Sequence, residues 1–229
     1  MNLQKIIETE YESCTKKTEE NISIENVTVP LLLKEYASYL RTCKANGPST
    51  DLNGHERDYG LALFIVREIN YSHEDITKFC LSFVNEIEET QKMGLFLSAL
   101  VNTNYQKNKR NNTEKIEYKL ITEHISNSKN ISCIGAYTDG AKITIIGDIG
   151  DSLCMRMREG DILVQGNVKE HIGYQMRGGT IHITGNANLV GTAMIGGEII
   201  VDGKIHSLAK GYRKMSGGTI YEKDRRVYP

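Results

Sequence analysis

Branched apolar residues in the second half of the chain occur as pairs at alternate positions, and the pairs recur at a nearly fixed interval. The pairs are Ile143/Ile145, Ile162/Val164, Ile181/Ile183 and Ile199/Val201. Alternation with a period of two is typical of a β-strand with one buried face. Strands that recur about every 20 residues predict a solenoid, in which neighbouring coils stack and share one apolar ladder.

Glycines and methionines repeat with the same interval as the strands. The first glycine column is Gly147, Gly166, Gly185 and Gly203, at separations of 19, 19 and 18 residues. The methionine column is Met157, Met176, Met194 and Met215, and the glycines three residues after each methionine are Gly160, Gly179, Gly197 and Gly218. We interpret the glycines as corners, where φ is positive or where two coils approach too closely for a Cβ. These columns indicate stacking and require no catalytic explanation.

The repeat predicts a right-handed parallel β-helix over 131–229, a single-stranded solenoid of about five short coils. A leucine-rich repeat is disfavoured because Leu is scarce in these coils. In the last coil Glu222 occupies an inward position, which suggests a terminal cap that prevents end-to-end growth. The first half of the chain is a candidate to cover the other end.

In the first half of the chain, apolar residues follow the spacing of amphipathic helices. Only 4 of the 21 glycines precede residue 130. The pattern predicts helices over 29–43, 59–69, 73–90 and 93–105, with a polar turn at 51–58. Ser72 and Asp75 predict a capping box at the start of the third helix. We therefore expect an α-helical domain over 1–105, which places the whole chain in the α+β class.

Residues 106–130 join the two halves, and we expect them to form a linker or a short helix. The stretch from Lys107 to Thr113 is polar enough to be an exposed linker. The segment from Ile116 to Ile125 is the candidate for a short helix that enters the second domain.

The composition excludes several classes of function. A net charge of −1 argues against a binder of nucleic acid or of an anionic membrane, and the chain has no Trp and only 4 Phe for stacking on bases. The five cysteines include no C-x-x-C pair, so we expect no metal and no iron–sulfur cluster. We interpret the thiols as small buried apolar groups of a cytoplasmic protein. No apolar run reaches the length of a signal peptide or of a membrane span.

Three polar features are candidate sites, and each has a simpler alternative. The segment His55–Asp58 is either an acid–base cluster or the solvated start of a helix, and we favour the helix start. His182, between two inward isoleucines, points outward and is more often an inert surface residue than a ligand. Arg156, Arg158 and Arg177 are either a recognition site for an acidic partner or phosphate, or solvated charges, and we favour solvated charges.

The outward side of the strands carries an unexpected apolar column. Between the inward pairs, the outward positions are Thr144, Leu163, His182 and Ile200. Apolar groups in a row on an exposed face indicate a contact surface, either for the helical half of the chain or for another chain. The candidate interface consists of Leu163, His182, Ile200, Arg158 and Arg177.

The repeat resembles a known family of glycine-rich domains. Residues 166–181, GNVKEHIGYQMRGGTI, and residues 185–199, GNANLVGTAMIGGEI, resemble the GXGXG repeat domain. That domain forms the C-terminal part of the glutamate synthase large subunit, and in methanogens it forms the core of one of the subunits of formylmethanofuran dehydrogenase. The resemblance covers about residues 130–220. This chain departs from the pattern at Cys154 and Glu159, where the next coil has Gly173 and Gly178.

The resemblance implies a right-handed parallel β-helix that acts as a scaffold, with the flavin, cluster and pterin sites on other domains or chains. We therefore expect a non-catalytic scaffold or protein-interaction protein without a cofactor of its own, which binds a protein partner or a second copy of itself. The alternative is a structural subunit of a glutamate synthase-like or formylmethanofuran dehydrogenase-like oxidoreductase complex. A third possibility is an enzyme that uses a groove between the two halves.

Overall fold

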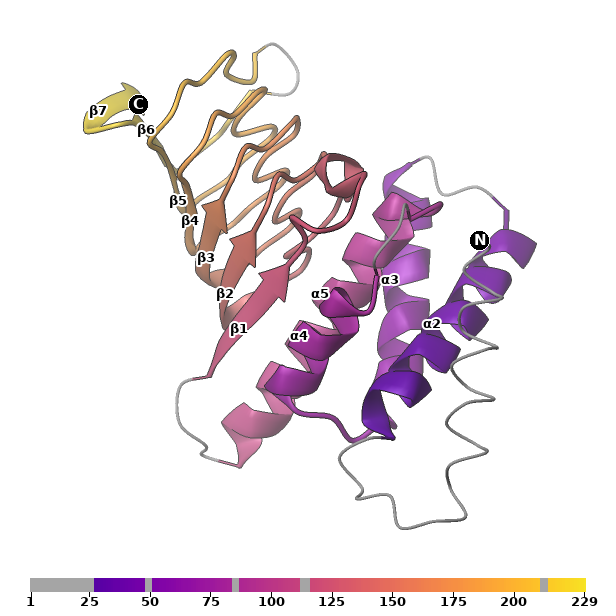
Figure 1. Cartoon of the computed structure of the whole chain (residues 1–229). Coiled ribbons are helices and arrows are strands. Elements are labelled where there is room, and N and C mark those ends of the chain that lie inside the picture. Colours follow the sequence, from indigo (N-terminus) through magenta and orange to yellow (C-terminus); the bar gives the residue numbers. More distant parts are fainter. Residues whose placement is uncertain (1–26, 48–50, 84–86, 112–115, 211–213) are drawn as a thin grey trace, which may run out of the picture.

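Four helices precede a parallel β-solenoid in the computed structural model, which describes residues 27–47, 51–83, 87–111, 116–210 and 214–229 (Figure 1). The helices are α2 (Thr28–Ala45), α3 (Leu52–Val66), α4 (His73–Leu81) and α5 (Thr90–Arg110). The α+β class and the β-helix prediction are thereby confirmed. Within the described segments, no helix combines the length and the apolar character needed to cross a bilayer.

The helices predicted over 29–43 and 93–105 correspond to α2 and α5. The predicted capping box at the start of α4 is also present. In that box the Asp75 amide donates to Ser72 Oγ (3.2 Å), and the Ser72 amide donates to Asp75 Oδ2 (2.9 Å). The third helix ends at Leu81, however, and not near residue 90. A helix cannot continue through Ile87, because its main-chain amide and carbonyl are both bonded to the Asn127 side chain, in a loop of the solenoid (3.0 and 2.9 Å).

The polar turn predicted over 51–58 is wrong, because α3 begins at Leu52. The Asp51 side chain caps this helix by accepting a hydrogen bond from the Gly54 amide (2.8 Å). Gly54, Asp58 and Ala62, spaced four residues apart, form one buried face. A buried carboxylate on that face interrupts the apolar pattern, which is why the sequence suggested a turn.

In the described part of the chain, seven strands form one sheet in chain order, and all neighbours are parallel except the last pair. The strands are β1 (Glu117–Ile121), β2 (Asp139–Ile146), β3 (Glu159–Gln165), β4 (Thr180–Ile183), β5 (Glu198–Val201), β6 (Thr219–Glu222) and β7 (Arg225–Tyr228). The inward ladder is confirmed: Ile143, Ile162, Ile181 and Ile199 are register partners in successive strands, and each is at most 1% exposed.

The short helix predicted over 116–125 is wrong, because this segment forms β1. Tyr118 and Leu120 are fully buried and pair with Ile143 and Ile145, so β1 adds a further rung to the ladder. The predicted linker is also partly helical: α5 extends to Arg110, and Lys107 Nζ donates to the Ile69 carbonyl (2.9 Å). Thr113 lies outside the described residues.

The methionine and glycine columns interlock between coils. A Cβ on Gly197 would lie 2.6 Å from the Met176 methyl group, and a Cβ on Gly218 would lie 2.5 Å from the Met194 methyl group. Met157, Met176 and Met194 therefore each fill the space left by a glycine of the next coil, and not the space beside the glycine three residues after the methionine. Gly147, Gly166, Gly185 and Gly203 stack backbone on backbone, as the corner interpretation predicts.

A further column of corners is built from residues that have a Cβ. Tyr137, Arg156, Gln175 and Ala193 all adopt left-handed backbone conformations, with φ between 52° and 59°. Such a conformation costs a residue other than glycine about 1–2 kcal/mol. The repeat thus imposes its turn geometry even where the sequence has no glycine.

Ala193→Gly is expected to raise the free energy of unfolding by about 0.5–1 kcal/mol, because glycine adopts φ near 52° without steric cost. Chemical denaturation followed by circular dichroism measures the effect. The control is Ala187→Gly at a buried position without positive φ, which should lower stability by about 1 kcal/mol. Equal effects at the two positions would contradict the strain at residue 193.

Both ends of the parallel stack are covered. At the first end α4 packs on β1 and α5 packs on β2. The side-chain amide of Asn102, on α5, donates a hydrogen bond to the Ala136 carbonyl (3.1 Å). At the other end β7 turns back antiparallel to β6, and Glu222 accepts a hydrogen bond from the Ile205 amide (2.7 Å). The helical half therefore covers the first coils, and Glu222 lies in a terminal hairpin.

Candidate interaction surfaces on the solenoid

The predicted outward column forms a continuous row on the outer face of the sheet. Thr144, Leu163, His182 and Ile200 are register partners in β2–β5, and Tyr221 continues the row in β6. Figure 1 shows the helices beyond β1 at one end of the stack, and no described helix packs extensively on β3, β4 or β5. The helical half therefore does not cover the centre of this row.

The outer face of β3–β5 is apolar at its centre and acidic at its margins. Leu163 and Ile200 are only partly buried. Asp161 and Glu198 lie in the neighbouring outward column, and these three strands contain no Lys or Arg. His182 is not a lone histidine, because its Nε2 lies 2.9 Å from both carboxylate oxygens of Asp202.

The arginines of the sequence motif converge on a cavity of about 490 Å³ at the methionine corner. Arg156, Arg158 and Arg177 line it together with Glu56 of α3 and Tyr137. Gln175 and Ile195, on the next two coils, complete the wall. We call this space the arginine cavity. It lies between α3 and the solenoid, so the sequence placed its residues in two different domains.

Two kinds of arginine occur in the arginine cavity. Arg156 is held on both sides, because its Nε donates to Gln175 Oε1 (2.8 Å) and its guanidinium forms an ion pair with Glu56. Arg158 and Arg177 lie on adjacent coils and are exposed. Their side chains have no hydrogen-bond or ion-pair partner among the residues that the structure describes.

Tyr137 lines the arginine cavity, and its buried hydroxyl group has no partner among the described residues. The ring of Tyr137 stacks on Tyr59 (centroids 4.4 Å apart). Burial, with smaller effects of Cys133 and Tyr59, raises the pKa of Tyr137 to about 12. The hydroxyl is therefore protonated near neutral pH and is able to donate a hydrogen bond.

The residues of the polar segment 55–58 do not act together. Glu56 points to Arg156, whereas Asp58 is completely buried with one oxygen 3.1 Å from Arg57 Nε. Burial lowers the pKa of His55, so this imidazole is neutral near pH 7. The helix-start interpretation is confirmed by α3, but the segment is not uniformly solvated.

A second face of the solenoid carries ladders of polar side chains that the sequence analysis missed. Asp148 Oδ1 accepts from the Asn167 amide (2.7 Å), Asn167 Oδ1 from the Asn186 amide (2.8 Å), and Asn186 Oδ1 from the Lys204 amide (2.9 Å). A groove of about 640 Å³ runs along this face. The residue after each corner glycine, Asp148, Asn167 and Asn186, was the available signal. The ladders bind coil to coil, so they stabilise the stack.

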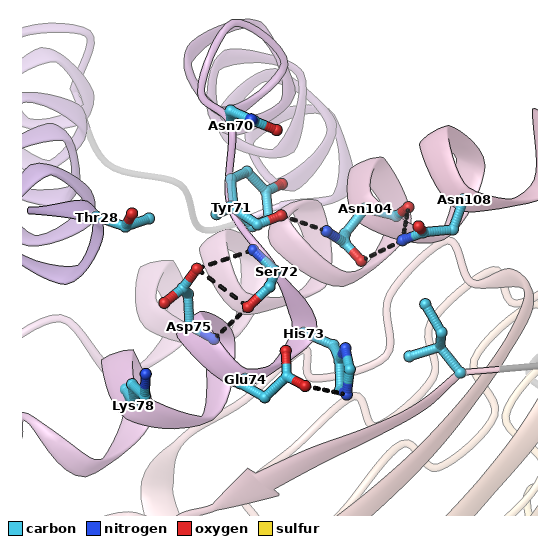
Figure 2. A pocket seen from close by; sticks show the side chains of 11 residues that line it. Thr28, Asn70, Tyr71, Ser72, His73, Glu74, Asp75, Lys78, Asn104 and Asn108 are labelled. Atoms are coloured by element: carbon cyan, nitrogen blue, oxygen red, sulfur yellow. Dashed lines mark hydrogen bonds and ion pairs between the residues drawn. The ribbon is translucent and has the colours of Figure 1, made fainter. Parts of the chain in front are cut away.

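A cavity of about 720 Å³ lies beside the start of α4 (Figure 2). Its polar walls are largely bonded to one another. Asn104 donates to the Tyr71 carbonyl (2.6 Å), Asn108 donates to Asn104 Oδ1 (2.7 Å), and His73 lies 3.0 Å from Glu74. Figure 2 shows these pairs around the capping box, so the polar groups here serve the fold.

The cysteines are buried apolar groups wherever the structure describes them. Cys43, Cys80, Cys133 and Cys154 are free and buried, and burial raises the pKa of each thiol. Cys154 adopts the left-handed φ (56°) of the glycine column in which it stands. Cys14 lies outside the described residues.

We also looked for a metal site and for similar proteins. Among the described residues no three His, Cys, Asp or Glu side chains are grouped so that they could hold a metal ion. No family model, no curated protein and no solved structure matches the chain. The geometry of the two surfaces, the outer face of β3–β5 and the arginine cavity, is therefore the basis for a functional proposal.

Proposed function

We propose that this protein is a non-catalytic scaffold, whose β-solenoid presents the outer face of β3–β5 to a protein partner in the cytoplasm. The observation that carries the proposal is the row of Leu163, His182 and Ile200 on a face that no described helix covers. Apolar groups in register on an exposed sheet are typical of contact surfaces.

The rigidity of the solenoid supports this role. The ladder between Ile162, Ile181 and Ile199 fixes the spacing of the outward residues, so the row exists before any partner binds. Both ends of the stack are covered, which directs association to the lateral faces and away from end-to-end growth.

The negative charge of the outer face of β3–β5 indicates which kind of protein surface would bind there. Asp161, Glu198 and Asp202 flank the apolar row, and β3–β5 contain no Lys or Arg. We expect a protein with an apolar patch bordered by Lys or Arg, because opposite charges at the rim orient the encounter. A second copy of this chain would have to supply such a patch from another face.

The test is a binding measurement with the partner that co-purifies from the source organism. Cross-linking with mass spectrometry should place that partner on β3–β5. The double variant Leu163→Arg/Ile200→Arg should weaken its binding at least tenfold, because it removes the apolar centre and repels a basic rim. The control Ala45→Arg, exposed at the end of α2, adds an arginine elsewhere and should leave binding unchanged.

Two results would contradict the scaffold role. One is a chain that remains a monomer without a stable partner at any concentration. The other is a partner whose affinity is the same for the double variant and for the wild type.

A structural subunit of an oxidoreductase complex is the second candidate. Its support is the resemblance of the repeat to the GXGXG domain, together with the backbone stacking of Gly166 on Gly147 and of Gly185 on Gly166. In that case the solenoid is right-handed, with about five coils, and holds catalytic chains around it. The purified complex should then contain flavin, iron–sulfur or pterin proteins, and unrelated partners would count against this candidate.

A further inference from the structure

The arginine cavity has an excess of positive charge. Arg156, Arg158 and Arg177 contribute +3 and Glu56 contributes −1, which leaves a formal charge of +2. Glu56 is paired with Arg156, so the excess belongs to Arg158 and Arg177. Like charges on adjacent coils repel each other, and an anion bound between them removes this repulsion.

The unpaired groups of the cavity are all hydrogen-bond donors. Arginine presents a planar fork of N–H groups that matches two oxygens of a phosphate or a carboxylate. Arg158 and Arg177 are exposed and have no such partner among the described residues, so their N–H groups are accessible to a ligand.

The cavity is larger than one oxyanion needs. Its volume of about 490 Å³ is within the range of sites for small organic molecules. Tyr137 and Ile195, a residue 49% exposed, provide apolar surface in the same wall. The ligand therefore combines an anionic group with an organic part.

We propose that the arginine cavity binds a small organic phosphate, whose phosphate group is held by Arg158 and Arg177. A phosphate fits better than a single carboxylate, because its two charges balance the formal charge of +2. Arg156 is a positioning residue: Gln175 and Glu56 hold it at the rear of the site. The site is independent of the outer face of β3–β5, so each proposal is tested without the other.

The test is calorimetric titration of the full chain with phenyl phosphate, inorganic phosphate and benzoate at one ionic strength. We expect saturable binding of one phenyl phosphate per chain, with weaker binding of inorganic phosphate and of benzoate. Arg158→Gln/Arg177→Gln should weaken phenyl phosphate binding at least tenfold, because two charged hydrogen-bond donors are lost. Lys169→Gln/Lys204→Gln removes the same charge from another face of the solenoid and should leave affinity unchanged.

Glu56→Gln separates ligand binding from a structural role. The substitution removes a carboxylate that offsets part of the positive charge in the cavity, so phenyl phosphate should bind several-fold more tightly. Tyr137→Phe removes a buried hydroxyl group and should leave phenyl phosphate binding and the stacking on Tyr59 unchanged. A purely structural role of Glu56 would not produce tighter binding in Glu56→Gln.

Several outcomes would overturn the site. Absence of saturable binding by phenyl phosphate would do so, as would equal affinity of the wild type and the double arginine variant. If inorganic phosphate bound as tightly as phenyl phosphate, the organic part of the ligand would be refuted. If benzoate bound most tightly, the ligand would be a carboxylate and the phosphate assignment would be wrong.

Discussion

Gly94→Ala is expected to lower the free energy of unfolding by about 3 kcal/mol, although alanine is the better helix former. Gly94 lies in α5, where that helix crosses the first loop of the solenoid. A Cβ at this position would overlap the Ser132 carbonyl oxygen and lie 2.9 Å from the Ser132 carbonyl carbon. Backbone atoms cannot rotate away as a side chain does, so α5 and the loop would have to separate.

Separation of α5 from the loop would also break hydrogen bonds that neighbour the Gly94 contact. Nearby on α5, Ser98 Oγ lies 3.0 Å from the Cys133 carbonyl and accepts a hydrogen bond from the Ala136 amide (3.2 Å). Both bonds are buried, and buried groups that lose their partners are costly. Chemical denaturation followed by circular dichroism at 222 nm measures the loss of stability.

Gly60→Ala is the matched control for Gly94→Ala. Gly60 is exposed in α3, and a Cβ there would meet no atom within 4 Å. Alanine should therefore stabilise the protein by about 0.5–1 kcal/mol through its helix propensity. If both substitutions stabilised the protein, the close approach of α5 to the loop would be refuted.

Ile181→Ala should lower the free energy of unfolding by about 3–4 kcal/mol. Ile181 is completely buried in β4, between Ile162 of β3 and Ile199 of β5. The coils above and below are held by backbone hydrogen bonds and by the glycine columns, so they cannot close the cavity that alanine leaves. The transfer and the cavity components of the cost therefore add.

Two further substitutions calibrate the effect at Ile181. Ile181→Val removes one methyl group and should cost about 1 kcal/mol. Thr184→Ala, at an exposed position just beyond β4, should change stability by less than about 0.5 kcal/mol. A loss below about 1 kcal/mol for Ile181→Ala would contradict the shared ladder, because it would mean that the coil repacks freely.

The stacked coils could be predicted because stacking repeats one environment. Each coil meets its neighbour in the same way, so Ile162, Ile181 and Ile199 face identical surroundings and the sequence repeats the residue type. The position after each corner glycine carried an equally regular polar signal. That signal was missed because side-chain to backbone ladders leave no apolar pattern.

The coil interval, the inward faces and the capping box of α4 were readable from the sequence, since each depends on neighbours at a fixed spacing along the chain. That β1 is a strand emerged only from the three-dimensional fold, because a short segment becomes a strand when β2 offers it a register partner. The same holds for the arginine cavity, where Glu56 and Arg156 meet across 100 residues of chain. Contacts between distant segments depend on how helices and coils dock, and that docking leaves no periodic trace in the sequence.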